Sequence, residues 1–229
     1  MKARLVESRE IAPDVRHFVF EVPGAGQLSF MPGQWVSVEE PVNGEQITRA
    51  YSIASPPDGN RFELCLNLVK EGHLSPHLFA MRPGDTVETR GPFGTFVFRQ
   101  PPNDSVLVAT GTGIAPFRAM LADRLSKDSA RQITLLFGVR HEADLLYREE
   151  FEALAARHSN FRFWPTLTRP GPGWTGRTGR VQLLLEKAVG TRRDLDVYIC
   201  GLHEMVDQVR AMLKSMGFDR KRMIYEKYD

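Results

Sequence analysis

The sequence predicts a two-domain protein in which an antiparallel β-barrel precedes a parallel α/β sheet. The length of 229 residues slightly favours two domains over one. Up to about residue 100, short runs of β-favouring residues alternate with turn signals, a pattern typical of antiparallel barrels and sandwiches. From residue 104 onward, strand and helix patterns alternate four times, which indicates a parallel sheet. We therefore place one domain at 1–100 and the other at 104–229.

Five strands are expected in the first domain, each bounded by residues that favour turns. The runs between turns are rich in Val, Phe, Trp and Leu, and turns such as PVNGE (41–45) carry the Pro, Asn and Gly of tight turns. A short helix is expected at 76–81, directly before a turn at 82–85. The expected strands cover residues 15–22, 33–40, 49–54, 61–70 and 85–90.

The second domain is expected to be a five-stranded parallel sheet. Its helices are predicted at 116–125, 143–158, 181–189 and 203–217, the last ending at a glycine cap. Its strands are predicted at 105–110, 132–139, 161–168, 195–201 and 223–228. Sheets of this kind bind ligands at the carboxyl ends of their strands. Those ends lie at 110–116, 138–141, 166–170 and 200–204.

Composition and charge exclude several classes of protein. Apolar residues make up 42% of the chain and charged residues 25%, an ordinary globular balance. The net charge of +2 is lower than a general nucleic-acid binder would usually carry. The start of the chain has no apolar signal region, and no uncharged apolar run approaches the ~18 residues of a membrane span. We expect a monomer in a reducing, cytoplasmic setting, with no nucleic-acid or membrane partner.

The cysteines and histidines do not form a metal-binding pattern. Cys65 and Cys200 are the two cysteines, far apart and without a CxxC motif. This excludes a cysteine-ligated iron–sulfur cluster or zinc ribbon within the chain. The six histidines show no ligand spacing, so no metal site is assigned.

The segment GTGIAP follows a predicted buried strand and begins a predicted helix. Its glycines would let backbone N–H groups approach a pyrophosphate, and the helix dipole would favour the negative charge. Pro116 replaces the third glycine of the usual pattern and suits the first helical position. A tight structural turn remains the alternative. The candidate nucleotide-binding residues are Gly111, Thr112, Gly113 and Pro116.

The segment RAYS (49–52) lies on a predicted barrel strand and combines three useful side chains. Arg49 offers a fixed charge for phosphate, Tyr51 a flat face for a ring, and Ser52 a hydrogen-bond donor. A half-exposed alternating strand would look much the same. Likewise, Cys200 lies at the end of a predicted buried strand, and an ordinary role as a small core residue is the alternative.

Six motifs follow one another in a characteristic order. They are RAYS (49–52), GHLS (72–75) before PGD, GPFG (91–94), GTGIAP (111–116), ICG (199–201) and YEKY (225–228). Over the whole chain this order resembles the ferredoxin–NADP⁺ reductase superfamily. HLSPHL followed by PGD is most similar to the short bacterial ferredoxin/flavodoxin–NADP⁺ reductases. GPFGTF and WTGRTG also resemble NADH-linked oxygenase reductases.

The resemblance implies that the barrel binds FAD. Arg49 would bind a flavin phosphate, Tyr51 would stack on the isoalloxazine ring, and Ser52 would donate near its N5 atom. Ala50 belongs to the same motif. The start of the short helix would offer backbone and hydroxyl donors to the pyrophosphate. The residues that would supply them are His73, Leu74 and Ser75.

The resemblance also implies a nicotinamide nucleotide, NADP or NAD, on the α/β domain. Cys200 and Glu226, together with Ser52, would be catalytic and would flank the point where nicotinamide C4 meets flavin N5. Tyr228 would cover the other face of the flavin until the nicotinamide displaces it. Plant relatives end at this aromatic residue, whereas Asp229 follows it here.

Two features bear on which nucleotide and which partner are bound. Thr168, Arg169 and Arg177 match the Ser/Thr-Arg pair and downstream Gly-Arg that hold the 2′-phosphate in NADP-dependent bacterial reductases, which predicts a preference for NADPH. Residues 161–193 also carry a strong excess of positive charge. This run suggests an anion site or a docking face, with an ordinary solvated face as the alternative.

The implied function is exchange of a hydride with NADP(H) and of single electrons with a ferredoxin or flavodoxin. With no cluster in the chain, the one-electron acceptor must be a separate molecule. One alternative is the NADH-dependent reductase component of an oxygenase. Others are a reductase of free flavin and a non-catalytic flavin electron-transfer subunit, which would usually carry a cysteine cluster that this sequence lacks.

Overall fold

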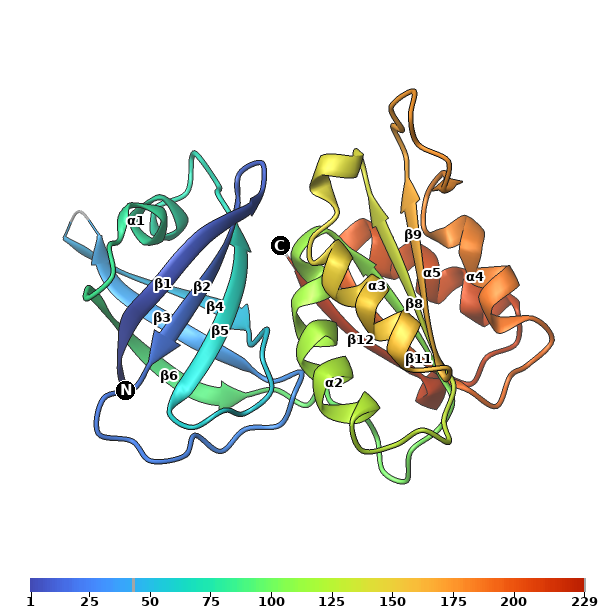
Figure 1. The fold of residues 1–229 in the computed structure, drawn as a ribbon, viewed down its shortest axis with the longest axis horizontal. Helices are drawn as coiled ribbons and strands as arrows, with labels where there is room; N and C mark the ends of the chain where they lie inside the picture. Colours follow the sequence, from blue (N-terminus) through green and yellow to red (C-terminus); the bar gives the residue numbers. More distant parts are fainter. Residues whose placement is uncertain (43, 229) are drawn as a thin grey trace. The chain divides into compact units, whose positions relative to one another are not determined.

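A computed structural model describes residues 1–42 and 44–228 (Figure 1). The chain forms two compact units. The first comprises Met1–Val97 and Ala115–Asp123, and the second comprises Phe98–Ile114 and Arg124–Asp229. Asn43, in the expected turn at 41–45, and Asp229 lie outside the described residues. In the described part of the chain, no helix is long and apolar enough to cross a membrane.

The first unit contains an antiparallel sheet with the strand order β4-β3-β6-β1-β2-β5. An antiparallel bridge joins Ile53, just after β4, to Leu64 in β5, and the Ala54 N–H donates to the Glu63 carbonyl at 2.8 Å. These contacts link the two outer strands and close the sheet, which confirms the expected barrel. The strands within the described residues are β1 (Lys2–Ala12), β2 (Val15–Glu21), β3 (Trp35–Val42), β4 (Glu45–Ser52), β5 (Arg61–Asn67) and β6 (Thr86–Phe93).

Strand β1 was not expected from the sequence. It pairs with β2 and β6 in the middle of the sheet, so the barrel has one strand more than predicted within the described residues. Its sequence KARLVESREIA buries Ala3 and Leu5 at alternate positions between charged outward residues, and irregularities in the pairing shift the alternation before the buried Ala12. The high charge hides a period-two pattern, because only the inward half of such a strand must be apolar.

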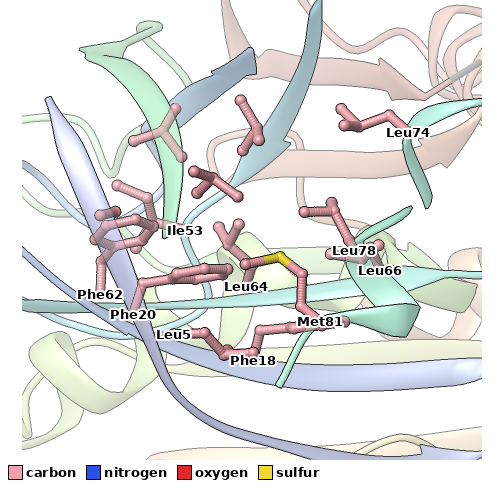
Figure 2. Close-up of a cluster of buried hydrophobic side chains, with 14 of the residues drawn as sticks. Leu5, Phe18, Phe20, Ile53, Phe62, Leu64, Leu66, Leu74, Leu78 and Met81 are labelled. Carbon is pink, nitrogen blue, oxygen red and sulfur yellow. The ribbon is translucent and has the colours of Figure 1, made fainter. Parts of the chain in front are cut away.

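The barrel core positions helix α1 (Leu74–Ala80). The rings of Phe18 and Phe20 stack at 6.2 Å, and Phe20 and Phe62 stack at 5.6 Å. Leu74 and Leu78 of α1 join this buried cluster (Figure 2). Full burial of each such side chain contributes about 1.5–3 kcal/mol, which holds the helix and its first turn in place.

The second unit is built on a parallel sheet with the order β10-β9-β8-β7-β11-β12. All five expected strands are present. Within the described residues the sheet has six strands, one more than predicted, because β10 was not expected. Strand β10 has two residues, too few to give a recognisable period. The strands are β7 (Ser105–Thr110), β8 (Ile133–Val139), β9 (Phe161–Leu167), β10 (Arg177–Thr178), β11 (Asp196–Leu202) and β12 (Met223–Tyr228).

Helices flank this sheet on both faces (Figure 1). Helices α4 (Gln182–Val189) and α5 (His203–Ser215) bury apolar side chains against the strands on one face. Helix α3 (Arg148–Arg157) lies on the other face, where its Phe151 ring is 5.3 Å from Phe163 of β9. The helix expected at 143–158 begins later, because the 3₁₀ turn η2 (Glu142–Asp144) and Tyr147, with φ of 54°, precede it.

Helix α2 (Ala115–Leu125) follows the 3₁₀ turn η1 (Gly111–Ile114). Most of it groups with the barrel in the first unit. Its Arg118 donates to the Ala54 carbonyl at 2.8 Å and pairs with Glu63 of β5. This partly buried charge pair joins the helix to the strands where the barrel closes.

Candidate functional site

Strand β4 ends in Arg49, Ala50, Tyr51 and Ser52. Arg49 and Tyr51 are two positions apart and therefore lie on the same face of the strand. Arg49 is exposed and its Nη1 donates to the Thr48 carbonyl at 2.8 Å. Tyr51 is half-buried against the core, and Ser52 is buried. Burial raises the pKa of Tyr51 to about 12, although the Arg49 charge opposes this, so the ring keeps a neutral hydroxyl.

The start of helix α1 holds the second group of candidate flavin ligands. His73 is exposed at the N-cap position, with no side-chain cap among the described residues, whereas Leu74 and Ser75 are buried. The Ser75 hydroxyl accepts from the Val69 N–H at 2.9 Å and donates to the Val69 carbonyl at 3.3 Å. Because Val69 engages this hydroxyl, backbone N–H groups of the first turn are the donors best placed for a phosphate.

The loop between β7 and α2 uses its two glycines differently. Gly111 has φ of +52°, and a Cβ built there meets no described atom within 4 Å. A Cβ at Gly113 would lie 2.4 Å from the Cys200 carbonyl oxygen. The first glycine therefore leaves the loop backbone open to a ligand, and the second permits close packing on β11. Thr112 is half-buried between them, and Pro116 lies in the first turn of α2.

Three candidate residues meet at the carboxyl ends of β11 and β12. Cys200 is fully buried and pairs in register with Glu226. Burial raises the pKa of the Cys200 thiol well above its usual value and the Glu226 carboxylate adds to this, while a hydrogen bond with Tyr228 opposes it. The thiol is therefore neutral at physiological pH. Glu226 and Tyr228 are both half-buried.

The predicted phosphate ligands gather around the end of β9. The Thr168 N–H donates to the Val139 carbonyl at 3.0 Å, and the Arg169 N–H donates to the Arg140 carbonyl at 2.8 Å. The segment after β9 therefore lies beside the end of β8. Arg169 is exposed. Arg177 begins β10, and its guanidinium carbon lies 4.7 Å from the centroid of the Trp164 ring. The Arg177 charge is thus partly held by an aromatic face, a contact that sequence spacing did not indicate.

Two further residues at this edge were missed from the sequence. The Thr110 hydroxyl oxygen is buried and has no hydrogen-bond partner among the described residues. Gly201 has φ of +148°, and a Cβ there would lie 2.5 Å from that oxygen. A buried polar atom without a partner at the ligand-binding end of a sheet is suited to a polar group of a ligand. The ICG motif could have identified Gly201, but Thr110 resembles any β-branched strand residue.

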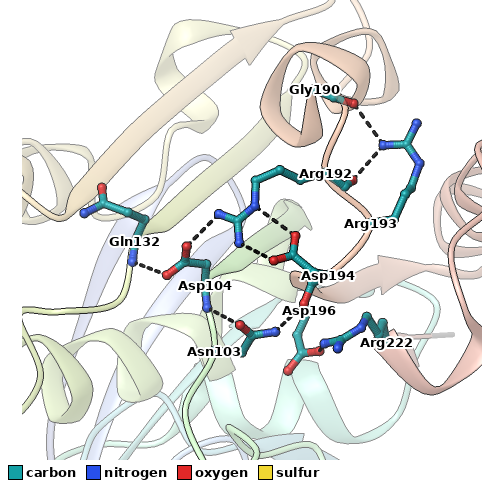
Figure 3. A network of polar contacts seen from close by, with 9 residues as sticks. All are labelled: Asn103, Asp104, Gln132, Gly190, Arg192, Arg193, Asp194, Asp196 and Arg222. Atoms are coloured by element: carbon teal, nitrogen blue, oxygen red, sulfur yellow. Dashed lines mark hydrogen bonds and ion pairs between the residues drawn. The ribbon is translucent and has the colours of Figure 1, made fainter.

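The basic run at 161–193 contains the candidate phosphate ligands Arg169 and Arg177, and also arginines that form ion pairs within the protein. Arg192 binds Asp104 at 2.6 Å and Asp194 at 2.9 Å, and Arg193 donates to the Gly190 carbonyl at 2.9 Å (Figure 3). These arginines hold the loop before β11 and serve the structure rather than a ligand.

Over residues 1–42 and 44–228, no group of His, Cys, Asp or Glu side chains could hold a metal ion.

Comparisons with known proteins agree with this arrangement. A family model described as an oxidoreductase FAD-binding domain matches residues 2–98. A second, described as an oxidoreductase NAD-binding domain, matches residues 107–211. The chain is 42% identical to ferredoxin–NADP reductase B of Sorangium cellulosum, over 100% of this chain and 97% of that protein. It is 29% identical to the toluate 1,2-dioxygenase electron transfer component of Pseudomonas putida, over 99% of this chain and 67% of that one.

Solved structures share the same fold. The cytochrome P450 reductase GcoB of Amycolatopsis superposes with a TM-score of 0.90 at 29% identity, covering 99% of this chain and 69% of that one. A ferredoxin NADP⁺ reductase from Neisseria gonorrhoeae with bound FAD and NADP superposes with a TM-score of 0.83 at 24% identity, covering 99% and 98%.

The residues present fit the two cofactors of such proteins. Strand β4 offers the exposed Arg49 charge and the Tyr51 ring on one face. At the carboxyl ends of the strands in the second unit, the backbone at Gly111 is open to a ligand. The Thr110 hydroxyl there has no partner among the described residues. The chain is a flavoenzyme with an FAD-binding domain and an NAD(P)-binding domain, and it belongs to the ferredoxin–NADP⁺ reductase-like family of oxidoreductases.

Proposed function

We propose that this flavoenzyme exchanges a hydride with NADP(H) and single electrons with a separate ferredoxin or flavodoxin. The observation that carries the proposal is the 42% identity to a ferredoxin–NADP reductase across nearly the full length of both proteins. The two cysteines cannot ligate a cluster within this sequence, so the proposed one-electron acceptor is a second molecule. FAD, when bound, supplies the chemistry that converts a two-electron hydride into single electrons.

The residues of the first unit would bind and orient the flavin. Arg49 would neutralise a phosphate, and the Tyr51 ring would stack on the isoalloxazine. The Ser52 hydroxyl would donate near N5. The first turn of α1, at His73, Leu74 and Ser75, would direct backbone N–H groups to the pyrophosphate.

The residues of the second unit would bind and orient the nicotinamide nucleotide. Gly111, Thr112, Gly113 and Pro116 would hold its pyrophosphate. Because burial keeps the Cys200 thiol protonated, this side chain would act through packing and a weak S–H bond and not as a nucleophile. Glu226 and Tyr228 share that end of the sheet, and Tyr228 would cover the flavin when no nicotinamide is bound.

Anaerobic stopped-flow experiments test the proposal directly. Purified protein should be yellow, release FAD, and be bleached by NADPH before it reduces an added ferredoxin or flavodoxin. Arg49→Ala should weaken FAD binding by the ~1.5–3 kcal/mol of a charged hydrogen bond. A protein that stays colourless after reconstitution with FAD would refute the proposal.

Preference for NADPH is the finer part of the proposal and rests on Thr168, Arg169 and Arg177. The exposed Arg169 guanidinium can meet phosphate oxygens bidentately. Arg169→Ala should raise KM for NADPH about tenfold, equivalent to ~1.4 kcal/mol, and leave KM for NADH almost unchanged. Arg162→Ala, which removes an exposed arginine of β9 from the same basic run, is the matched control. Equal losses with both nucleotides would contradict the assignment.

The second candidate function is the NADH-dependent reductase component of an oxygenase. It is favoured by the 29% identity to the toluate dioxygenase electron transfer component and by the stacking of Arg177 on Trp164, which gives Arg177 a structural role. A parental enzyme that prefers NADH would select this candidate over the first. For either candidate we propose a monomer in the cytoplasm, where the buried thiols of Cys65 and Cys200, which are not joined in a disulfide, stay reduced.

A further inference from the structure

Helix α2 is shared between the two compact units of the chain. The turn before it, Gly111–Ile114, groups with the second unit, whereas Ala115–Asp123 of the helix groups with the barrel. One peptide bond therefore separates the loop that would hold the nucleotide from the part of the helix that packs on the FAD-binding domain. Because of this connection, a shift of α2 on the barrel would also move the loop.

Apolar contacts hold α2 on the barrel. The rings of Phe96 and Phe117 are buried, and their centroids are 5.7 Å apart. A Cβ added at Gly33 would lie 2.9 Å from the terminal methyl of Met120, so the segment before β3 packs closely on the helix. Such burial is not directional, and a methionine side chain adapts to small displacements. These contacts stabilise the helix without fixing its exact position.

Arg118 adds directional contacts to two segments of the barrel. Its Nη1 donates to the Ala54 carbonyl at 2.8 Å and pairs with the Glu63 carboxylate of β5. The Arg118 and Glu63 side chains are only 16% and 26% exposed. Ala54 lies two residues after Ser52, and its N–H donates to the Glu63 carbonyl at 2.8 Å. One guanidinium thus binds both segments at the point where the chain that carries the RAYS motif meets β5.

A buried histidine belongs to the same cluster but carries no charge. His17 of β2 places its Nε2 atom 3.6 Å from Glu63 Oε2. Burial lowers the pKa of His17 to about 3, and the Arg118 charge adds to this. Because His17 is neutral at physiological pH, Arg118 is the cation that balances Glu63 in this cluster. Removing one member of such a pair leaves the other charge with reduced access to water, which is costly.

We propose that Arg118 is a positioning residue for hydride transfer, which fixes the nucleotide loop through Glu63 and the Ala54 carbonyl. The inference rests on the proposed function, in which the C4–H bond of NADPH breaks and its hydride passes to flavin N5. This step oxidises the nicotinamide and reduces the flavin by two electrons.

Stability alone does not account for an arginine at this position. Apolar residues often pack as stably as a buried ion pair of the same volume. Charge-assisted bonds to two acceptors fix orientation as well as contact. A transfer step needs that precision, because misplacing the reacting atoms by about 1 Å can cost 10²-fold in rate.

Variants of the pair test this role against a control on the same helix. Arg118→Met keeps the apolar stem and removes the donors, Arg118→Lys keeps the charge, and Glu63→Gln keeps the size of the acceptor. Arg124→Met is the matched control, because Arg124 pairs with Asp128 at 3.7 Å and these side chains are 12% and 18% exposed. Arg124 and Asp128 both group with the second unit, so the control breaks a similar pair outside the barrel.

Four measurements separate positioning from stability. Anaerobic stopped-flow absorbance of the FAD-loaded protein gives the limiting rate of flavin reduction at saturating NADPH. Calorimetry gives the Kd for NADP⁺, and thermal unfolding gives Tm. Hydrogen–deuterium exchange of the FAD-loaded protein, without nucleotide, reports how readily residues 111–114 open.

Arg118→Met should lower the limiting rate about tenfold and leave the Kd for NADP⁺ within about twofold. Exchange at residues 111–114 should become faster, because the helix that continues the loop is less firmly held. Arg118→Lys and Glu63→Gln should give intermediate rates, since each keeps part of the charge-assisted contact. Arg124→Met should lower Tm by a similar amount but keep the parental rate and exchange.

A parental rate in Arg118→Met, an equal loss of rate in Arg124→Met, or a rise in Kd for NADP⁺ that matches the fall in rate would overturn the positioning role. If Arg118→Met does not fold, parental rates in both Arg118→Lys and Glu63→Gln would overturn it. A parental protein that NADPH does not reduce would refute both this role and the proposed function. A parental protein that NADPH reduces, but that passes no electrons to a ferredoxin or flavodoxin, would refute the proposed function alone.

Discussion

The amino and carboxyl ends of the parallel sheet differ in how their polar side chains are hydrogen-bonded. At the amino ends of the strands, Arg192 binds Asp104 and Asp194, and Arg222 binds Asp196 at 3.0 Å (Figure 3). At the carboxyl ends, the Thr110 hydroxyl has no partner among the described residues and Arg169 is exposed. The charges named at the amino end are paired with one another, whereas the Thr110 hydroxyl at the carboxyl end is available to a ligand.

This difference separates stability from function along the same strands. Ligands of α/β sheets bind at the carboxyl ends, so groups there must be left for the ligand. The amino ends have no such requirement and can be joined by ion pairs and backbone contacts. The difference also explains why one basic run in the sequence contains two kinds of arginine. Substitutions at the carboxyl end should therefore change catalysis, and substitutions at the amino end should change stability.

The largest effect is expected at the carboxyl end. Glu226→Gln and Cys200→Ser keep the shapes of these side chains but alter the groups that would align the nicotinamide. Flavin reduction by NADPH should slow by about 10²-fold, because a small displacement of the reacting atoms costs this much. FAD content and Tm should change little. Stopped-flow absorbance measures the rate, and parental rates in both variants would contradict the proposed roles.

A smaller effect is expected from the two glycines of the nucleotide loop. Gly113→Ala places a Cβ 2.4 Å from the Cys200 carbonyl oxygen, a backbone atom that cannot easily move. The cost should be ~1–3 kcal/mol of unfolding free energy, with weaker NADPH binding. Gly111→Ala is the control: it meets only the left-handed strain of about 1 kcal/mol, because its Cβ points into open space. Equal losses in chemical denaturation would show that packing on β11 is not the constraint.

Patterns of strands and helices made much of this molecule predictable. The barrel, the alternating second unit and the carboxyl-end loops follow from period and turn residues. Strand β1 was not predicted because its outward residues are charged. Strand β10 was not predicted because two residues show no period. The buried Leu145 and Leu146 continued a helical pattern across a segment that forms no α-helix before Arg148.

Contacts between separate segments of the chain explain what the sequence could not predict at the site. Cys200 and Glu226 could be assigned together only by resemblance, and their register on neighbouring strands now places them side by side. Nothing in the local sequence pattern indicates that Arg177 stacks on Trp164 or that the Ser75 hydroxyl bonds to the Val69 backbone. The roles of these residues in binding cofactors remain predictions.

At the amino end, Arg192→Ala should lower stability without affecting catalysis. It removes the bonds to Asp104 and Asp194, but Arg192 is partly exposed, so solvent screening reduces their value. We expect a loss of about 1 kcal/mol and a fall in Tm of about 2–4 °C. Urea unfolding and stopped-flow reduction should be measured on the same sample. A slower flavin reduction would contradict the separation between the two ends of the sheet.

The smallest effect is the dependence of this loss on pH. Partial burial alone would raise the pKa of Asp104, but its bonds from Arg192 and the Gln132 N–H hold that pKa below its ordinary value. A carboxyl whose pKa is lowered on folding stabilises the protein above its unfolded pKa of about 4, and this contribution disappears as the pH falls through the folded pKa. The stability difference between parental protein and Arg192→Ala should therefore be constant from about pH 5 to 7 and shrink below about pH 4. Asp104→Asn, which cannot ionise, should lack the part of this acid dependence that comes from Asp104 and keep the part from Asp194, whose pKa Arg192 also lowers. A difference that persists unchanged at pH 3 in urea unfolding would show that Arg192 acts through packing and not through the Asp104 charge.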